Sequence, residues 1–256
     1  MSIRTDPWPA GTPCWVDVTV PDVAAATTFY GSVMGWTFVD TGEEFGHYNL
    51  AQTKGHNAAA ISPAQQEGQP AVWTVYIASD DVDATTKRVA DNGGRIMLEP
   101  MDVSGAGRMA IAQDTAGGVF GVWQSAEMTG TQIVNEPGSL AWTDARLTDP
   151  EAGKAFYAAV FGYTYEPIPG GPPDYSTFKV GDDIRGGIGG MMGASPEVPS
   201  HWLPYFSVAD VDAAIAAAES GGGRVLVQPM DTPFGRMATV ADPFGAVFAL
   251  HATISE

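Results

Sequence analysis

Short runs of alternating apolar and polar residues dominate the chain, and an amphipathic segment interrupts them at regular intervals. Residues 14–20 alternate as a strand does, and residues 21–36 carry Phe29, Val33 and Met34 on one helical stripe, with Gly35 near the end. Strand-like runs at 44–52 and 55–61 follow, separated by the turn residues around Gly55. This pattern predicts a strand, a helix and then further strands.

The same order returns between residues 72 and 123. A strand-like run at 72–78 precedes a helical segment at 80–94, and strand-like runs at 94–100, 108–113 and 119–123 complete the group. The first 123 residues therefore predict two units of the type βαβββ.

The second half of the chain repeats the first. RMAIAQDTAGGVFGVW at 108–123 returns as RMATVADPFGAVFALH at 236–251, GGRIMLEPMD at 93–102 as GGRVLVQPMD at 222–231, and FYGSVMGW at 29–36 as FYAAVFGY at 156–163. The stretch between the copies contains turn formers without a clear period. We therefore predict a domain at 1–126, a linker at 127–138 and a second domain at 139–256.

The spaced elements resemble the vicinal oxygen chelate superfamily, which includes glyoxalases, bleomycin-binding proteins and extradiol dioxygenases. They are an opening strand, PD, FY…G closing a helix, then DVDA…GG, GR and D…G before the last strand. The tandem form is also similar to actinobacterial hydroxylase-like antigens. The resemblance implies an α+β fold of tandem glyoxalase-like domains, in which two βαβββ units form a cupped mixed sheet with helices on its convex side.

Alternation along the strands separates residues that pack on the helices from residues that line the cup. Val16, Val18 and Val20 form the packed face of the opening strand, so the intervening positions face the cup. By this rule the candidate ligand-binding residues are Trp15, Thr74, Tyr76 and Trp123 in the first half, and Trp142, Arg146, Leu203 and Tyr205 in the second.

The resemblance also implies where metalloenzymes of the family hold a divalent ion. Those places carry Trp15, Thr74 and Gly121 in the first half, and Trp142, Leu203 and Ala249 in the second. None of these side chains offers the imidazole, thiolate or carboxylate that such ions prefer. His47, His56, His201 and His251 show no metal-type spacing. We therefore expect no metal ligands and no cofactor.

Charge limits the classes of partner that we expect, and cysteine content indicates the redox compartment. Thirty acidic and twelve basic side chains give a formal net charge of −18, which repels nucleic acid and anionic lipid. The single cysteine, Cys14, agrees with a reducing compartment. No apolar run has the length of a membrane helix or a signal peptide. We expect a cytoplasmic monomer or homodimer that meets a small-molecule ligand, with no nucleic-acid or membrane partner.

Asp17, Asp144 and His251 are the candidate catalytic residues. A cup-facing carboxylate beside a tryptophan would be partly desolvated, which raises its pKa toward values useful for proton transfer; alternatively, it only accepts hydrogen bonds. His251 replaces Trp123 of the first half, and an imidazole can act as acid or base near neutral pH, although a lone histidine is often structural. Arg108 and Arg236 are expected to pair with acids, and Asp114 and Asp242 to bond local backbone in turns.

Four functions remain open. The first is a metal-independent binding protein that holds an aromatic or amphipathic metabolite or drug in a tryptophan-lined cup. The second is a metal-independent isomerase, epimerase, cyclase or lyase in which Asp144 and His251 transfer protons. The third is a glyoxalase- or dioxygenase-like metalloenzyme with relocated ligands. The fourth is a structural protein whose cups are filled by its own side chains.

Overall fold

The computed structural model describes residues 2–253 and contains two eight-stranded mixed sheets. The first half contains β1 (Ser2–Ile3), β2 (Pro13–Val20), α1 (Val23–Met34), β3 (Thr37–Asp40), the 3₁₀ turn η1 (Glu43–Phe45), β4 (Asn49–Thr53), β5 (His56–Pro63), β6 (Val72–Ala78), α2 (Val82–Asp91), β7 (Arg95–Val103), β8 (Gly107–Gln113) and β9 (Val119–Ser125). The second half contains β11 (Leu140–Arg146), α3 (Pro150–Phe161), β12 (Thr164–Pro167), β13 (Ser176–Val180), β14 (Asp183–Gly189), β15 (His201–Ser207), α4 (Val211–Ser220), β16 (Arg224–Thr232), β17 (Gly235–Ala241) and β18 (Val247–Ala252).

Each half builds one sheet from two βαβββ units, as predicted. The strand orders are β3-β4-β5-β2-β6-β9-β8-β7 and β12-β13-β14-β11-β15-β18-β17-β16, so the two sheets have the same topology. Their central strands, β2 with β6 and β11 with β15, run antiparallel. The predicted α+β fold of tandem cupped sheets is therefore confirmed.

The four helices begin in the same way because an aspartate precedes each of them. Asp22, Asp81, Asp149 and Asp210 each accept a hydrogen bond from the backbone N–H three residues later, which satisfies a donor that the first helical turn leaves free. Helix α1 ends at Gly35, whose φ of 70° gives the left-handed turn that glycine adopts most easily. The PD and DVDA motifs therefore mark helix starts.

One stretch of the first unit differs from the prediction. Residues 44–48 belong to the η1 turn and the segment after it, so the strand expected at 44–52 begins only at Asn49. The edge strand Thr37–Asp40 was not predicted, because it is short and three of its four residues are exposed. Hydrophobic alternation is a weak signal in such an edge strand.

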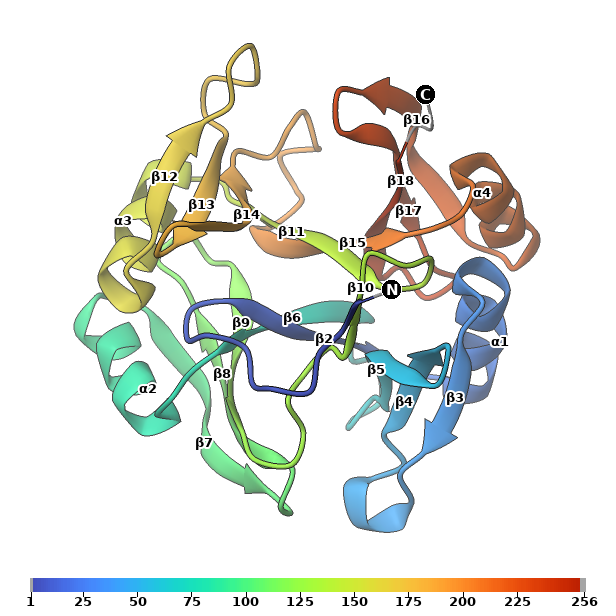
Figure 1. The fold of residues 1–256 in the computed structure, drawn as a ribbon, viewed down its shortest axis with the longest axis horizontal. Helices are drawn as coiled ribbons and strands as arrows, with labels where there is room; N and C mark the ends of the chain where they lie inside the picture. Colours follow the sequence, from blue (N-terminus) through green and yellow to red (C-terminus); the bar gives the residue numbers. More distant parts are fainter. Residues whose placement is uncertain (1, 254–256) are drawn as a thin grey trace.

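The two halves share a single hydrophobic core. In Figure 1 the sheets lie back to back, α1 lies beside α4 and α2 beside α3, and the cups open away from each other. Side chains from both halves, Tyr30 and Phe248 among them, belong to the same buried cluster. Among the described residues, no helix has both the length and the apolar character needed to cross a bilayer.

Two reciprocal hydrogen bonds cross the boundary between the halves. The phenol of Tyr30 in α1 donates to Asp242 (3.0 Å), and the phenol of Tyr157 in α3 donates to Asp114 (2.8 Å). Each aspartate also accepts two backbone N–H groups of its own turn. The local role predicted for Asp114 and Asp242 is confirmed, and the structure adds a contact to the other half.

The predicted linker at 127–138 packs along the first half. It contains β10 (Ile133–Val134), which pairs with β1 in a two-stranded sheet. The backbone N–H of Thr131 donates to Cys14, and that of Gln132 donates to Asn57. Cys14 itself is buried.

Candidate functional site

The cup faces carry the residues that strand alternation assigned to them. In the first half Trp15, Tyr76 and Trp123 form a buried cluster separate from the shared core. In the second half Leu203, Tyr205 and Ala249 do the same, with Trp142 packed against them. The register pairs Trp15 with Tyr76 and Trp142 with Tyr205, so each tryptophan lies next to a tyrosine on the neighbouring strand.

A buried carboxylate lies at the centre of the first cup. Asp17 accepts hydrogen bonds from the phenols of Tyr48 (2.9 Å) and Tyr76 (3.0 Å), and the Tyr48 oxygen accepts one from the indole of Trp15 (2.8 Å). Burial raises the pKa of Asp17 from 3.8 to about 6, although both phenols act to lower it. The carboxyl of Asp17 is thus desolvated, and its pKa is raised toward the range useful for proton transfer. Thr74 lies opposite Asp17 on β6.

This raised pKa makes the stability of the protein depend on Asp17 between about pH 4 and pH 6. Because the folded carboxyl holds its proton more tightly than the unfolded one, this group costs stability as pH rises through that window. A pKa raised from 3.8 to about 6 corresponds to about 3 kcal/mol. We expect Asp17→Asn to gain about this much over the wild type between pH 4 and pH 7, measured by urea unfolding.

The exposed carboxyl of Asp6 provides the matched control, because Asp6→Asn removes one surface charge and no buried one. A constant difference between Asp17→Asn and the wild type across this pH range would contradict the assigned titration.

The second cup places more donors around its carboxylate. Asp144 accepts from the indole of Trp142 (2.8 Å), the phenols of Tyr175 (2.7 Å) and Tyr205 (2.8 Å), and the guanidinium of Arg146 (2.6 Å). Burial and the negative charge of Asp144 raise the pKa of both phenols well above the ordinary value, so the phenols remain donors at physiological pH. Asp144 is thus the hub of a charge-assisted network.

Tyr48 and Tyr175 are site residues that the sequence reasoning missed. Each phenol donates to the aspartate of its own half, and Tyr175 lies 127 positions after Tyr48. The same spacing relates Trp15 to Trp142 and Asp17 to Asp144. Alignment of the two halves at this spacing could have identified the pair.

Two glycines make room for tyrosines of the cups, Gly121 for Tyr76 and Gly187 for Tyr175. A Cβ at Gly121 would lie 2.1 Å from the ring of Tyr76, and one at Gly187 would lie 2.0 Å from the Tyr175 hydroxyl and 2.2 Å from the Asp144 carboxylate. These glycines thus let a side chain of the same domain approach each strand closely.

The structure does not bring His251 to Asp144. Asp144 pairs with Leu203 on β15, whereas His251 pairs with Ser207 of that strand. Four residues at about 3.3 Å each separate these pairs by about 13 Å along the sheet. The Nε2 of His251 lies 2.8 Å from the Phe234 carbonyl, and its Nδ1 is buried without a partner among the described residues. Strand alternation gave the correct face but could not give this separation.

The chain covers the first cup more than the second. Trp8 and Met128 pack against the cluster of the first cup; the Trp8 indole donates to Thr131, and the Trp123 indole donates to Met128. In the second cup Trp142, Met237 and Val247 are only partly buried, and Arg146 retains 12% of its side-chain exposure. Both cups keep a partly exposed aromatic group, Tyr48 in the first and Trp142 in the second, and the second cup adds the partly exposed guanidinium of Arg146.

The cup residues do not fit a divalent metal ion. Over residues 2–253, the structure contains no group of three or more histidine, cysteine, aspartate or glutamate side chains placed to hold one. Each cup contributes one central carboxylate, and phenol and indole donors already surround it. A metal ion would need several donor atoms free of such hydrogen bonds.

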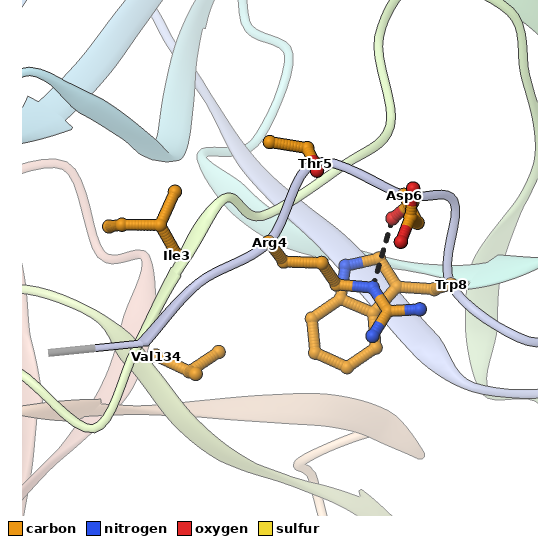
Figure 2. A pocket seen from close by; sticks show the side chains of 6 residues that line it. All are labelled: Ile3, Arg4, Thr5, Asp6, Trp8 and Val134. Atoms are coloured by element: carbon orange, nitrogen blue, oxygen red, sulfur yellow. Dashed lines mark hydrogen bonds between the residues drawn. The ribbon is translucent and has the colours of Figure 1, made fainter.

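Two shallow pockets lie outside the cups. The larger, about 260 Å³, lies between the N-terminal segment and β10, where Arg4 stacks on Trp8 at 4.5 Å (Figure 2). The smaller, about 210 Å³, lies between the halves and includes Arg88 and Phe161. Arg88 already donates to the Val160 carbonyl and the Thr85 hydroxyl, so it has a structural role there.

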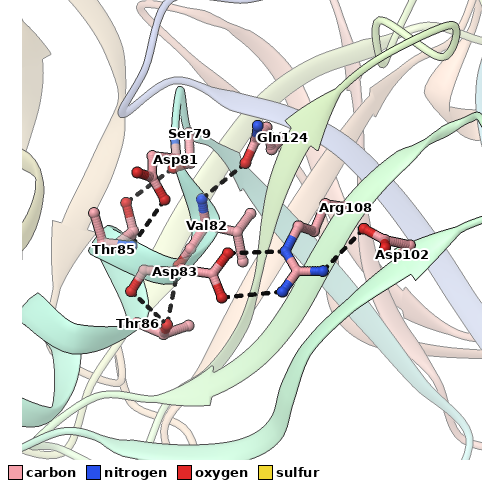
Figure 3. A network of polar contacts seen from close by, with 10 residues as sticks. Ser79, Asp81, Val82, Asp83, Thr85, Thr86, Asp102, Arg108 and Gln124 are labelled. Carbon is pink, nitrogen blue, oxygen red and sulfur yellow. Dashed lines mark hydrogen bonds and ion pairs between the residues drawn. The ribbon is translucent and has the colours of Figure 1, made fainter.

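The repeated arginines pair with acids, as predicted. Arg108 contacts Asp83 at the start of α2 and Asp102 on β7, as Figure 3 shows. Arg236 forms the same bridge to Asp212 and Asp231. These pairs fasten a helix start to the edge of each sheet and lie outside the two cup networks.

Comparison with known proteins agrees with this architecture. The family model described as glyoxalase/bleomycin resistance protein/dioxygenase superfamily matches residues 14–122 and 139–250. The provisionally named glyoxylase CFP32 of Mycobacterium tuberculosis is 40% identical over 247 residues, covering 94% of both chains. The anthracycline biosynthesis protein DnrV of Streptomyces peucetius is 37% identical over 257 residues, covering 94% of this chain and 92% of its own.

Solved structures show the same fold at low sequence identity. The Mn(II)-bound glyoxalase of Novosphingobium aromaticivorans has a TM-score of 0.68 at 15% identity, covering 96% of this chain and 83% of its own. The 2,3-dioxygenase LapB of Pseudomonas sp. KL28 has a TM-score of 0.64 at 13% identity, covering 98% and 94%. With two family matches in tandem and relatives similar along nearly their whole length, the chain belongs to the glyoxalase/bleomycin resistance protein/dioxygenase superfamily.

Proposed function

We propose that the chain binds a flat, mainly apolar small molecule in its second cup, without a metal ion. The observation that carries this proposal is the partly exposed pair Trp142 and Arg146 beside the buried carboxylate of Asp144. A concave surface with aromatic walls and a few fixed polar groups is typical of small-molecule sites. The first cup is the weaker candidate, because Trp8 and Met128 pack against its aromatic cluster and it has no arginine beside its carboxylate.

The relatives favour a polycyclic aromatic ligand. DnrV is named as a protein of anthracycline biosynthesis, and anthracyclines are polycyclic aromatic ketones. A molecule of that class would lie against the indole of Trp142 in offset-stacked geometry. The CFP32 name points to glyoxalase chemistry, but the cup residues do not fit the metal that the resemblance implies for it.

The competing proton-transfer enzyme receives less support from the geometry. It requires Asp144 and His251 to act on one ligand, yet they lie about 13 Å apart along the sheet. Asp144 is also surrounded by four donors, so its oxygens are poorly available as a base. We therefore assign Asp144 to positioning the walls of the cup.

Titration with 1,8-dihydroxyanthraquinone tests the binding proposal. Met237 lies in the second cup and its repeat partner Met109 in the first, so Met237→Trp and Met109→Trp are matched changes. We expect calorimetry to show one equivalent bound by EDTA-treated wild type. A bulkier ring in a packed site costs about 1–3 kcal/mol, so Met237→Trp should weaken binding about tenfold or more.

Met109→Trp should bind as the wild type does. Equal weakening by both variants, or no binding by the wild type, would contradict the assignment to the second cup. One equivalent of tightly held divalent metal in the purified protein would contradict the metal-independent part.

A further inference from the structure

The guanidinium of Arg146 has donors that the protein does not use. Both of its hydrogen bonds, to Asp144 and to the Tyr205 hydroxyl (2.7 Å), come from Nη2. Its Nε is buried without a partner among the described residues, and Nη1 takes part in none of their hydrogen bonds. Buried donors without acceptors are rare in folded proteins. The second cup therefore has a hydrogen-bond donor that lacks an acceptor.

Charge determines which acceptor fits there. The carboxylate of Asp144 already balances Arg146, and the chain as a whole carries −18, so an anionic ligand would meet repulsion. His201 lies opposite Arg146 in the strand register, and burial lowers its pKa, so it adds no positive charge at neutral pH. A cationic ligand would face the guanidinium itself. A neutral carbonyl oxygen accepts a hydrogen bond without either penalty.

The surroundings of Arg146 favour a planar ligand. The guanidinium lies over the ring of Tyr175 at 5.9 Å, and the partly exposed indole of Trp142 belongs to the same face of β11, four residues before Arg146. The small side chain of Ala249, which pairs with Tyr205 in the sheet, leaves space at the neighbouring position of the cup surface. A flat aromatic skeleton can contact Trp142 while its carbonyl group points toward Arg146.

The first half shows that the arginine is not needed to fold such a cup. Thr19 occupies the equivalent place on β2, and its hydroxyl bonds to that of Ser62 (3.0 Å). Asp17 is held there by two phenols without any guanidinium. The first half therefore indicates the substitution Arg146→Thr, which removes the guanidinium donor and keeps an aspartate held by phenols.

We propose that Arg146 makes the second cup selective for neutral aromatic ketones or quinones by donating to their carbonyl oxygen. This selectivity rests on the proposed function, because it assumes that a flat ligand enters this cup. Tyr205 and Asp144 position the guanidinium, and Trp142 contacts the ring system.

Three probes with one skeleton separate the contributions: 2-acetylnaphthalene, 2-ethylnaphthalene and 2-naphthoate. We expect the wild type to bind the ketone about tenfold or more tightly than the hydrocarbon, since hydrogen bonds to charged donors are the stronger class. The ketone should also bind more tightly than the carboxylate. In Arg146→Thr the ratio of ketone affinity to hydrocarbon affinity should fall to about threefold or less, with circular dichroism unchanged.

Arg146→Lys retains a charged donor and should preserve part of the ketone preference. A wild type that binds hydrocarbon and ketone equally, a preference that survives in Arg146→Thr, or tighter binding of 2-naphthoate would overturn the proposed selectivity. Hydrocarbon binding that Met237→Trp abolishes would then still support the second cup as the binding site. No binding of any probe would overturn both proposals.

Discussion

Replacing Asp144 by alanine is expected to lower the free energy of unfolding by about 3–5 kcal/mol. The change leaves the largely buried guanidinium of Arg146 without its partner, and an uncompensated buried charge is among the most costly defects in a fold. The phenols of Tyr175 and Tyr205 lose their acceptor as well. Urea unfolding at pH 7 measures the loss, with the linear slope showing whether the transition stays two-state.

A double-mutant cycle separates the charge pair from the rest of the network. Asp144→Ala combined with Arg146→Thr removes both charges, so we expect the double variant to recover about 1–3 kcal/mol relative to additivity. Asp17→Ala provides the comparison in the first half, where no arginine faces the carboxylate, and its cost should be smaller. Additive losses in the cycle, or equal costs for Asp17→Ala and Asp144→Ala, would contradict the role assigned to Arg146.

The fold could be predicted from the sequence because its signals are local and occur twice. Val16, Val18 and Val20 identify the packed face of one strand, and the repeat at 108–123 and 236–251 confirms the order of elements. The short edge strand Thr37–Asp40 gave no such signal because it is mostly exposed. Its place in the sheet comes from pairing with β4, a long-range property.

The candidate site was only partly predictable. Alternation placed Trp15, Asp17, Trp142 and Asp144 on the cup faces, since side chains change sides at every strand residue. It could not find Tyr175, which precedes its strand and reaches Asp144 because β14 has Gly187 at that point. Nor could it show that Asp144 and His251 lie apart, because strand register depends on pairing between distant segments.

The boundary between the halves should be as important to stability as the cup networks. Asp114→Ala and Asp242→Ala each remove an acceptor of two backbone N–H groups and of one phenol from the other half. Since each buried donor left unpaired costs about 1–3 kcal/mol, we expect losses of at least about 3 kcal/mol for either variant in urea unfolding. One cooperative transition should persist, because both sheets pack on the same core.

Tyrosine-to-phenylalanine variants remove the contact between the halves and keep the backbone hydrogen bonds of each aspartate. The Tyr157 hydroxyl also accepts a hydrogen bond from the Trp202 indole (2.8 Å), whereas the equivalent Trp73 indole, although close to the Tyr30 phenol, makes no hydrogen bond of that geometry. Both variants remove a donor to a buried aspartate, but Tyr157→Phe also leaves the Trp202 indole N–H unpaired and should cost about 1 kcal/mol more than Tyr30→Phe. Equal costs would contradict this difference. Two separate unfolding transitions in either variant would show that the halves are stabilised independently, and the shared core would then not couple the two cups.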